Sequence, residues 1–388
     1  MARSRPVIIS VVGARPQFIK LAALLRRLDR TFNSRVVHTG QHYDPEMSDA
    51  FFTEYCLRPP DAGLNVGPAP PNRQLARMVD RLDRYFHRAK PDMVLVFGDT
   101  TTTMAGALAA ALRNIPLGHI EAGLRSFDLC MAEEKNRVIA DHLSTWLFCP
   151  TNEATCNLKT EGVRSGIYPV GDVMAETFRL PRRLPAGISR EWWGGHSCLP
   201  VLGEHDVGRQ KCLPHRSGSL SPAKGSYYFV TLHRAEAVDE PENLGRLVEM
   251  IEALDRPVVF PVHPRTLKNL RRFRLLGRLR RNENIHLLPP VGHHASLWFI
   301  ANACAVLTDS GGVQKEAYWA CVRCLTVRTV TEWGLLVDSG WNELVGFSKT
   351  KLLRALKSPF RPRRVADPVF LRKNASTAIV RQLRRDLC

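Results

Sequence analysis

The segment TDSGGVQKEAYWA, residues 308–320, decides the fold class that the sequence predicts. An apolar run at residues 303–307 precedes it and has the length of a buried strand. Val313, Ala317 and Ala320 follow at helical spacing. The Ser-Gly-Gly triplet therefore predicts a tight turn from a strand into a helix. Glycines in such a turn allow a ligand to approach the backbone, and the first N–H groups of a helix attract phosphate.

This turn is the predicted phosphate site. Ser310, Gly311 and Gly312 form the turn, and Glu316 lies one helical turn further on, on the same side. A carboxylate at that position is suited to accept hydrogen bonds from ribose hydroxyls. A Ser-Gly-Gly triplet also occurs in plain structural turns, so the assignment depends on the rest of the chain.

Strands and helices alternate along most of the chain. Predicted strands cover residues 7–12, 36–38, 93–97, 116–120, 145–149, 227–232, 258–262 and 303–307. This alternation predicts right-handed βαβ units and parallel sheets. A length of 388 residues exceeds one ordinary core. The expected fold class is therefore α/β, with two doubly wound Rossmann-like domains that face a cleft.

The composition along the chain indicates where the domains divide. Residues 179–225 are rich in Pro, Gly, Ser and Arg and show no sustained period. We interpret them as an irregular insertion after a linker. The expected domains are residues 1–172 and residues 173–368, the second of which contains the insertion, followed by a C-terminal segment at residues 369–388.

Charge and cysteine content limit the possible partners and compartments. The net charge of +18 predicts attraction to polyanions, but no nucleic-acid motif accompanies the basic clusters, so we expect no specific nucleic-acid partner. No apolar run approaches the roughly 20 residues of a membrane span, so no membrane insertion is expected. The N-terminus lacks a recognisable cleavage site, and the ten cysteines are scattered. Reduced thiols and a cytoplasmic location are expected.

Six of the predicted strands are followed by a polar residue just past the carboxyl end. These residues are Arg15, Asp99, Glu121, His233, His263 and Ser310. In open α/β sheets this edge lines the ligand crevice, so the pattern predicts an active site between the domains.

The types of these residues indicate proton transfer beside a diphosphate. Carboxylates that share a site have separated pKa values, so Asp99, Glu121 and Glu133 permit one base and one acid. His233 supplies a further proton carrier or a positive charge. The cationic groups at Arg15, Lys20 and His263 suit a diphosphate.

Eight stretches together resemble one enzyme family. They are GARPQFIK (13–20), TGQH (39–42), GDTTT (98–102), HIEAGLR (119–125), EEKNR (133–137), LHRAE (232–236), PVH (261–263) and DSGGVQ (309–314). In this order they resemble the non-hydrolysing UDP-N-acetylglucosamine 2-epimerases, across about residues 7–175 and 227–347. The resemblance implies a GT-B-like fold, a C-terminal helix at residues 369–388 that returns to the first domain, and a homodimer.

The resemblance also implies roles for individual residues. The family's catalytic groups correspond to Asp99, Glu121, Glu133 and His233. Its substrate-binding groups correspond to Arg15, Lys20, His263, Ser310, Gly311, Gly312 and Glu316. The implied reaction interconverts UDP-N-acetylglucosamine and UDP-N-acetylmannosamine by elimination of UDP to a 2-acetamidoglucal and re-addition of UDP. It requires no cofactor.

Other functions stay open from the sequence. Four segments resemble the branch that includes UDP-2,3-diacetamido-2,3-dideoxyglucuronate 2-epimerases, namely GARPQF (13–18), QKEAY (314–318), TEW (331–333) and GWN (340–342). A GT-B glycosyltransferase, a non-catalytic UDP-sugar binding protein or a hydrolysing epimerase would share the fold. His196, Cys198, Cys212 and His215 offer zinc ligands, but their spacing is unfamiliar and the reaction needs no metal, so none is expected.

Overall fold

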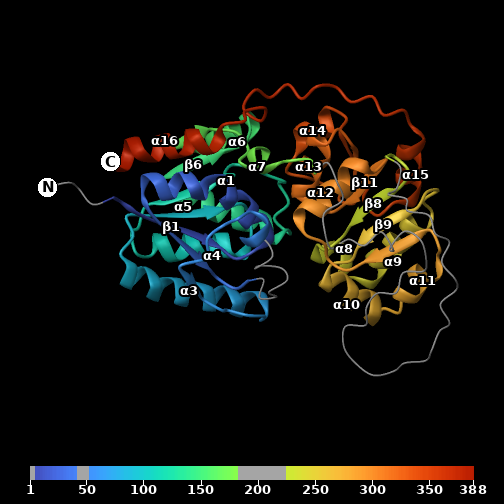
Figure 1. Ribbon diagram of the computed structural model, residues 1–388, viewed down its shortest axis with the longest axis horizontal. Coiled ribbons are helices and arrows are strands. Elements are labelled where there is room, and N and C mark those ends of the chain that lie inside the picture. Colours follow the sequence, from blue (N-terminus) through green and yellow to red (C-terminus); the bar gives the residue numbers. More distant parts are fainter. Residues whose placement is uncertain (1–4, 42–51, 182–223) are drawn as a thin grey trace. The chain divides into compact units, whose positions relative to one another are not determined.

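The computed structural model describes residues 5–41, 52–181 and 224–388 (Figure 1). The chain divides into two compact units. Unit 1 comprises Met1–Phe178 and Val365–Cys388, and unit 2 comprises Arg179–Arg364. Each unit contains its own parallel sheet with alternating helices, so the predicted α/β class with two doubly wound domains is confirmed. Most of the predicted insertion, including its candidate zinc ligands, lies outside the described residues.

The described part of unit 1 contains a seven-stranded sheet in the order β3-β2-β1-β4-β5-β6-β7. The strands are β1 (Val7–Val12), β2 (Asn33–His38), β3 (Ala62–Gly63), β4 (Met93–Phe97), β5 (Leu117–Ile120), β6 (Trp146–Cys149) and β7 (Ile167–Pro169). All neighbouring strands pair in parallel. β1 and β4 have the bounds that their apolar runs predict.

The helices of unit 1 belong to two groups. They are α1 (Arg15–Thr31), α3 (Pro71–Ala89), α4 (Thr101–Ala111), α5 (Ala132–Leu143), α6 (Asn152–Thr160), α7 (Met174–Thr177) and α16 (Ala375–Leu387). α4 packs against α3 and against α5, and α1 packs against α7 and α16 (Figure 1). Trp146 Nε1 donates to Asp386 Oδ2 over 2.7 Å, which ties α16 to β6.

The described part of unit 2 contains a six-stranded sheet in the order β10-β9-β8-β11-β12-β13. The strands are β8 (Tyr228–Thr231), β9 (Val258–Pro261), β10 (Ile285–Leu288), β11 (Ala305–Thr308), β12 (Arg323–Thr326) and β13 (Asn342–Leu344). The helices are α8 (Ala235–Val238), α9 (Pro241–Glu252), α10 (Pro264–Arg272), α11 (Leu276–Arg281), α12 (His293–Asn302), α13 (Gly311–Trp319), α14 (Gly334–Asp338) and α15 (Lys349–Lys357).

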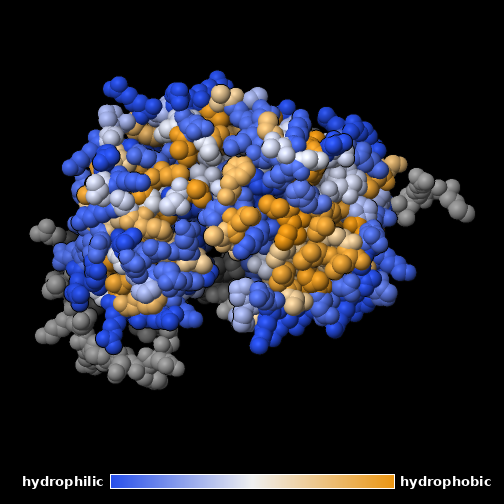
Figure 2. Space-filling model, turned by 180° about the vertical axis from the view of Figure 1, so that it is seen from behind, coloured by the Kyte–Doolittle hydropathy of each residue, from blue (hydrophilic) through white to orange (hydrophobic). Residues whose placement is uncertain are grey.

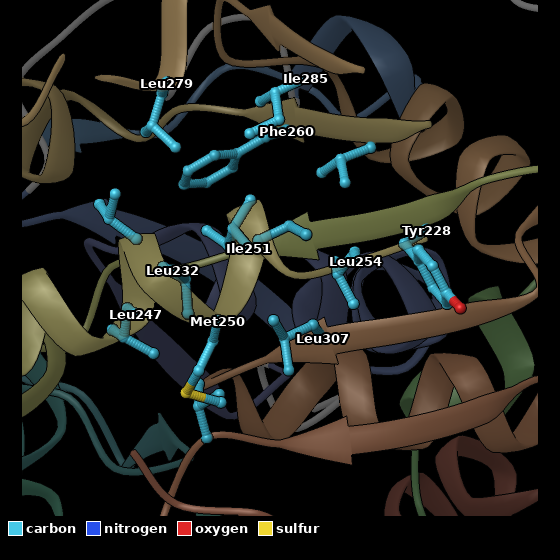
Figure 3. Packing of buried hydrophobic residues seen from close by; sticks show 14 of the residues in the cluster. Tyr228, Leu232, Leu247, Met250, Ile251, Leu254, Phe260, Leu279, Ile285 and Leu307 are labelled. Carbon is cyan, nitrogen blue, oxygen red and sulfur yellow. The ribbon is translucent and has the colours of Figure 1, made fainter. Parts of the chain in front are cut away.

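Alternate residues of the buried strands fill two cores, one on each face of the unit 2 sheet. Val230 and Phe260 pack with α9 residues such as Ile251 on one face (Figure 3). Phe229 packs on the other face, where its ring stacks on Phe299 at 5.7 Å between centroids. Burial on both faces explains why these strands read as continuous apolar runs.

The strand orders place a topological switch point in each sheet. In unit 1 the chain leaves β1 toward β2 and returns to pair β4 on the other side of β1. In unit 2 the same change of direction occurs between β8 and β11. Ligands in open α/β sheets bind beyond the carboxyl ends of the strands at such a point.

A buried amide fixes the unit 1 switch point. The Gln17 Oε1 atom accepts from the N–H groups of Gly13 (2.8 Å) and Ala14 (3.0 Å). Its Nε2 donates to the carbonyl of Phe97 (3.0 Å) and to Thr103 Oγ1 (3.1 Å). One side chain therefore joins the turn after β1 to the end of β4.

Apolar side chains also reach the surface of unit 1. Leu112, Phe127 and Leu129 are exposed, and Figure 2 shows an apolar area among polar surface on the reverse view. Among the described residues, no helix combines the length and the apolar character needed to cross a membrane.

We predict that Gln17→Ala lowers the unfolding free energy of unit 1 by at least about 2 kcal/mol, because several buried backbone groups lose their hydrogen-bond partner. The matched control is Gln74→Ala on α3, which removes one bond to the Gly67 carbonyl at a half-buried position. The control should change stability by less than about 1 kcal/mol. Hydrogen exchange of β1 and β4 peptides across a urea series measures the stability of both variants. Equal unfolding midpoints in Gln17→Ala and Gln74→Ala would contradict the role of Gln17.

Candidate functional site

The turn after β5 carries a buried ion pair. Lys20 Nζ on α1 lies 2.6 Å from Glu121 Oε2, and both side chains are nearly inaccessible. Glu121 has a positive φ of 72°, which is unfavourable for a residue other than glycine. Gly98 lies against the pair, since a Cβ there would come within 2.8 Å of Lys20 Nζ. The fold thus brings together a predicted catalytic residue and a predicted substrate-binding residue.

A second paired carboxylate follows β4. Asp99 Oδ2 lies 2.8 Å from Arg137 Nη1, and Arg137 also contacts Glu134 Oε2 at 3.0 Å. The Asn136 amide donates to the Asp99 carbonyl at 2.7 Å. α5 therefore holds both the backbone and the carboxylate of Asp99. Arg137 is almost fully buried, and the sequence assigned it no role.

Glu133 is the second residue of α5 and is partly exposed in its first turn. Asn136 and Arg137 stand three and four residues later and both contact Asp99. Residues at this spacing share a helix face, so Glu133 shares the face that meets the β4 edge. Arg15 is the first residue of α1, directly after the β1 turn. All four predicted residues from unit 1 besides Lys20 thus lie at strand ends or helix starts.

The predicted strand-to-helix turn is present in unit 2. β11 ends at Thr308, Ser310 caps α13, and its Oγ accepts from the Val313 N–H at 3.5 Å. Gly311 and Gly312 are the first two residues of α13. The turn therefore presents the N-terminus of a nine-residue helix at the unit 2 switch point.

Asp309 links the ends of β8 and β11. Its Oδ2 accepts from the N–H groups of His233 (2.7 Å) and Arg234 (2.8 Å). His233 Nδ1 lies 3.3 Å from Asp309 Oδ1, while the His233 ring keeps part of its surface exposed. The ring of His263 lies 5.4 Å from that of His233, between centroids. The two predicted histidines therefore lie side by side at this edge.

The predicted reason for the glycine at residue 311 is the approach of a ligand to the backbone. The structure gives a different physical reason for this glycine. A Cβ at Gly311 would collide with Glu332 Oε1, so the space is needed for this buried carboxylate. Glu332 Oε2 accepts from Arg328 Nη1 at 2.8 Å, and Glu332 Oε1 lies 3.8 Å from Arg234 Nη2. A valine at Gly311 would disturb this cluster whether or not a ligand binds nearby.

Glu316, the predicted ribose acceptor, is buried and already has a protein partner. His293 Nε2 lies 2.6 Å from Glu316 Oε1, and His293 is likewise buried at the start of α12. The contact orients the carboxylate from the neighbouring helix. Periodicity places Glu316 on α13 but carries no information on this partner.

Arg137, Asp309 and Glu332 have no role in the sequence-based prediction. Each of them contacts a predicted site residue, respectively Asp99, His233 and Gly311. The available signal was a charged residue inside or beside an otherwise apolar run, because such a residue must be paired when buried.

The described residues hold no group of three or more His, Cys, Asp or Glu side chains arranged for a metal. Cys321 and Cys324 have redox spacing, but burial raises the pKa of Cys324 to about 12. A thiol with a raised pKa is a poor nucleophile.

Comparisons with known proteins cover nearly the whole chain. A Methanococcus maripaludis protein named as a UDP-N-acetylglucosamine 2-epimerase homolog is 42% identical over 378 residues, 97% of this chain and 99% of its own. The UDP-2,3-diacetamido-2,3-dideoxy-D-glucuronate 2-epimerase of Pseudomonas aeruginosa is 35% identical over 362 residues, 90% of this chain and 91% of its own.

A solved structure shares the fold. The Methanocaldococcus jannaschii UDP-GlcNAc 2-epimerase, in complex with UDP-GlcNAc and UDP, matches with a TM-score of 0.83 and 35% identity. The match covers 97% of this chain and 99% of that one. The GT-B-like class with two Rossmann-like domains is thereby confirmed. Since the profile of the UDP-N-acetylglucosamine 2-epimerases also matches residues 26–384, this chain belongs to that family.

Proposed function

We propose that this chain is a non-hydrolysing epimerase that interconverts UDP-N-acetylglucosamine and UDP-N-acetylmannosamine. The observation that carries the proposal is the pair of cation-bound carboxylates that follow the carboxyl ends of β4 and β5. These are Glu121 with Lys20 and Asp99 with Arg137. The named activities of relatives that cover nearly the whole chain support the same reaction class.

Unit 2 holds the nucleotide in this proposal. The N-terminus of α13, capped by Ser310, supplies N–H groups and a partial positive charge for the diphosphate. His233 and His263 lie side by side at the same edge of the sheet and add donors. Glu316 accepts from the ribose hydroxyls, and His293 fixes its orientation.

The reaction proceeds by elimination and re-addition. A carboxylate removes the C2 proton, the C2–H electron pair forms the C1=C2 bond, and the C1–O bond breaks with its pair on the departing UDP. UDP then adds back to C1 of the 2-acetamidoglucal while a proton reaches the opposite face of C2. No net oxidation occurs, so the reaction needs no redox cofactor.

The ion pairs support this chemistry. A C2 proton is weakly acidic, so departure of an anionic diphosphate must assist its removal, and cationic donors stabilise that leaving group. Lys20 Nζ lies 2.6 Å from Glu121 Oε2 and Arg137 Nη1 lies 2.8 Å from Asp99 Oδ2, so each carboxylate has a fixed cationic partner. Glu133, which is partly exposed, is the third group available to carry a proton.

UDP-2,3-diacetamido-2,3-dideoxyglucuronate is the second substrate to assay, because one relative is named for it. A homodimer and a cytoplasmic location, both expected from the sequence, stay predictions.

Deuterium incorporation tests the function. We predict that incubation with UDP-N-acetylglucosamine in deuterated water places deuterium at C2 of an intact nucleotide sugar and yields the C2 epimer, both observed by NMR. Free N-acetylmannosamine together with UDP would instead indicate a hydrolysing enzyme. An unlabelled, unchanged substrate would argue for a transferase or a binding protein.

The carboxylates are tested individually. We predict that Asp99→Asn, Glu121→Gln and Glu133→Gln each lower kcat at least about a hundredfold, as loss of proton transfer does. UDP affinity should stay within about threefold, or about 0.7 kcal/mol. The control Asp80→Asn breaks an exposed pair with Arg84 on α3 and should leave kcat unchanged. Near-normal turnover removes that residue from the catalytic set.

The nucleotide site is tested through its carboxylate. We predict that Glu316→Gln weakens UDP binding about tenfold or more, because it removes a charge-assisted acceptor. The control Glu343→Gln lies on β13, where Glu343 pairs with Arg323 at the surface. Isothermal titration with UDP measures both, and equal affinities would mean that the ribose is bound elsewhere.

A further inference from the structure

A row of buried charges lies beneath the ends of β4 and β5 in unit 1. His119, in the middle of β5, has no exposed surface. Its Nδ1 lies 2.7 Å from Asp141 Oδ1, and its Nε2 lies 2.7 Å from the carbonyl oxygen of Gly98. Asp141 Oδ2 accepts from Arg125 Nη1 at 2.6 Å and from the Gly123 N–H at 3.1 Å.

These contacts determine how the imidazole is held. A carbonyl oxygen only accepts, so the His119 Nε2 donates to Gly98 O. Burial raises the pKa of Asp141, but His119 and Arg125 outweigh burial and hold that pKa below its usual range. The ring of His119 is therefore fixed between the Asp141 carboxylate and the Gly98 carbonyl.

The neighbouring groups complete the charge balance. Arg125 Nε also lies 2.6 Å from Glu161 Oε1, and the half-exposed His142 meets Glu161 Oε2 at 3.1 Å. The hydrogen bond from Arg125 is the main cause that lowers the pKa of Glu161. Burial raises the pKa of the nearby Cys149 thiol to about 12, so that group adds no charge. Charges therefore alternate along the row, the condition under which buried ions are tolerated.

The row holds the backbone of both carboxylate turns. Gly98 donates its N–H to the Ile120 carbonyl at 2.9 Å, and its own carbonyl contacts His119 Nε2. Two residues of β5 therefore bond the backbone of Gly98. Asp99 is the next residue. At the other turn, Asp141 holds the N–H of Gly123, two residues after Glu121. One ion pair therefore joins the two turns.

We propose that His119, held between Asp141 and the Gly98 carbonyl, is a positioning residue that sets the carboxylates of Asp99 and Glu121 for proton transfer. The positioning of the two turns stands on the geometry, and the consequence for proton transfer rests on the proposed epimerase function. The ring makes both short contacts because its two nitrogens lie on opposite sides. A glutamine amide at residue 119 has no ring that places two nitrogens in this way.

The first test needs no variant and no activity. Nitrogen-15 NMR of histidine-labelled full-length protein reports whether each ring nitrogen bears a proton. His119 is assigned by cross-peaks from its ring protons to Gly98. The Nε2 nitrogen should bear a proton, because it donates to the Gly98 carbonyl oxygen, which only accepts. An unprotonated Nε2 at His119 overturns the proposal.

The second test separates positioning from general stability. His119→Gln should lower kcat at least about tenfold, while KM and UDP affinity change less than about twofold. The matched control is Glu161→Gln, which alters the exposed end of the same row and should leave kcat within about twofold. Unchanged kcat in His119→Gln, or an equal loss in both variants, overturns the proposal.

A third readout works even if the chain is not an epimerase. Hydrogen exchange of peptides covering residues 97–101 and 120–124 should be at least tenfold faster in His119→Gln than in the parent protein. Unit 2 peptides should be unchanged. Exchange that is unaltered at both turns overturns the positioning role, whatever the enzyme assay shows. If His119→Gln does not fold, Asp141→Asn takes its place in the same measurements.

Discussion

A buried charge is tolerated only where an opposite charge or hydrogen-bond partners lie within contact distance, and this constraint organises the edge of unit 1. Lys20 is nearly inaccessible and meets Glu121, Arg137 is nearly inaccessible and meets Asp99, and His119 meets Asp141. Each pair joins two elements of secondary structure. The pairs therefore determine where the carboxylates lie.

The parallel sheet explains why so many polar groups meet in a small region. Every strand of a parallel sheet ends at the same edge, and the switch point leaves two neighbouring strands whose following segments diverge to opposite faces. In unit 1 these strands are β1 and β4, and in unit 2 they are β8 and β11. The turns after them carry Arg15, Asp99, His233 and Ser310.

Close packing around this edge restricts the backbone. A side chain at Gly13 would meet the hydroxyl groups of Thr39 and Thr102, which bond to each other at 2.8 Å. Glu121 holds a positive φ that costs on the order of 1–3 kcal/mol for such a residue. The hydrogen bonds at both ends of its turn compensate for that strain, since the Glu121 N–H donates to Phe148 O and the Gly123 N–H donates to Asp141 Oδ2. Strain maintained by surrounding contacts is typical of a functional site.

The sequence by itself determined the order and type of the main elements. The apolar runs at residues 7–12 and 93–97 have the bounds of β1 and β4, and the Ser-Gly-Gly triplet does start α13, because strands, turns and caps depend on local chemistry. Only the tertiary structure decided the partners. Lys20 and Glu121 are about a hundred residues apart, Gly311 makes room for Glu332, and His119 reaches Gly98 across neighbouring strands. Periodicity reports which side of an element is buried, but strand order and helix packing choose what lies against it.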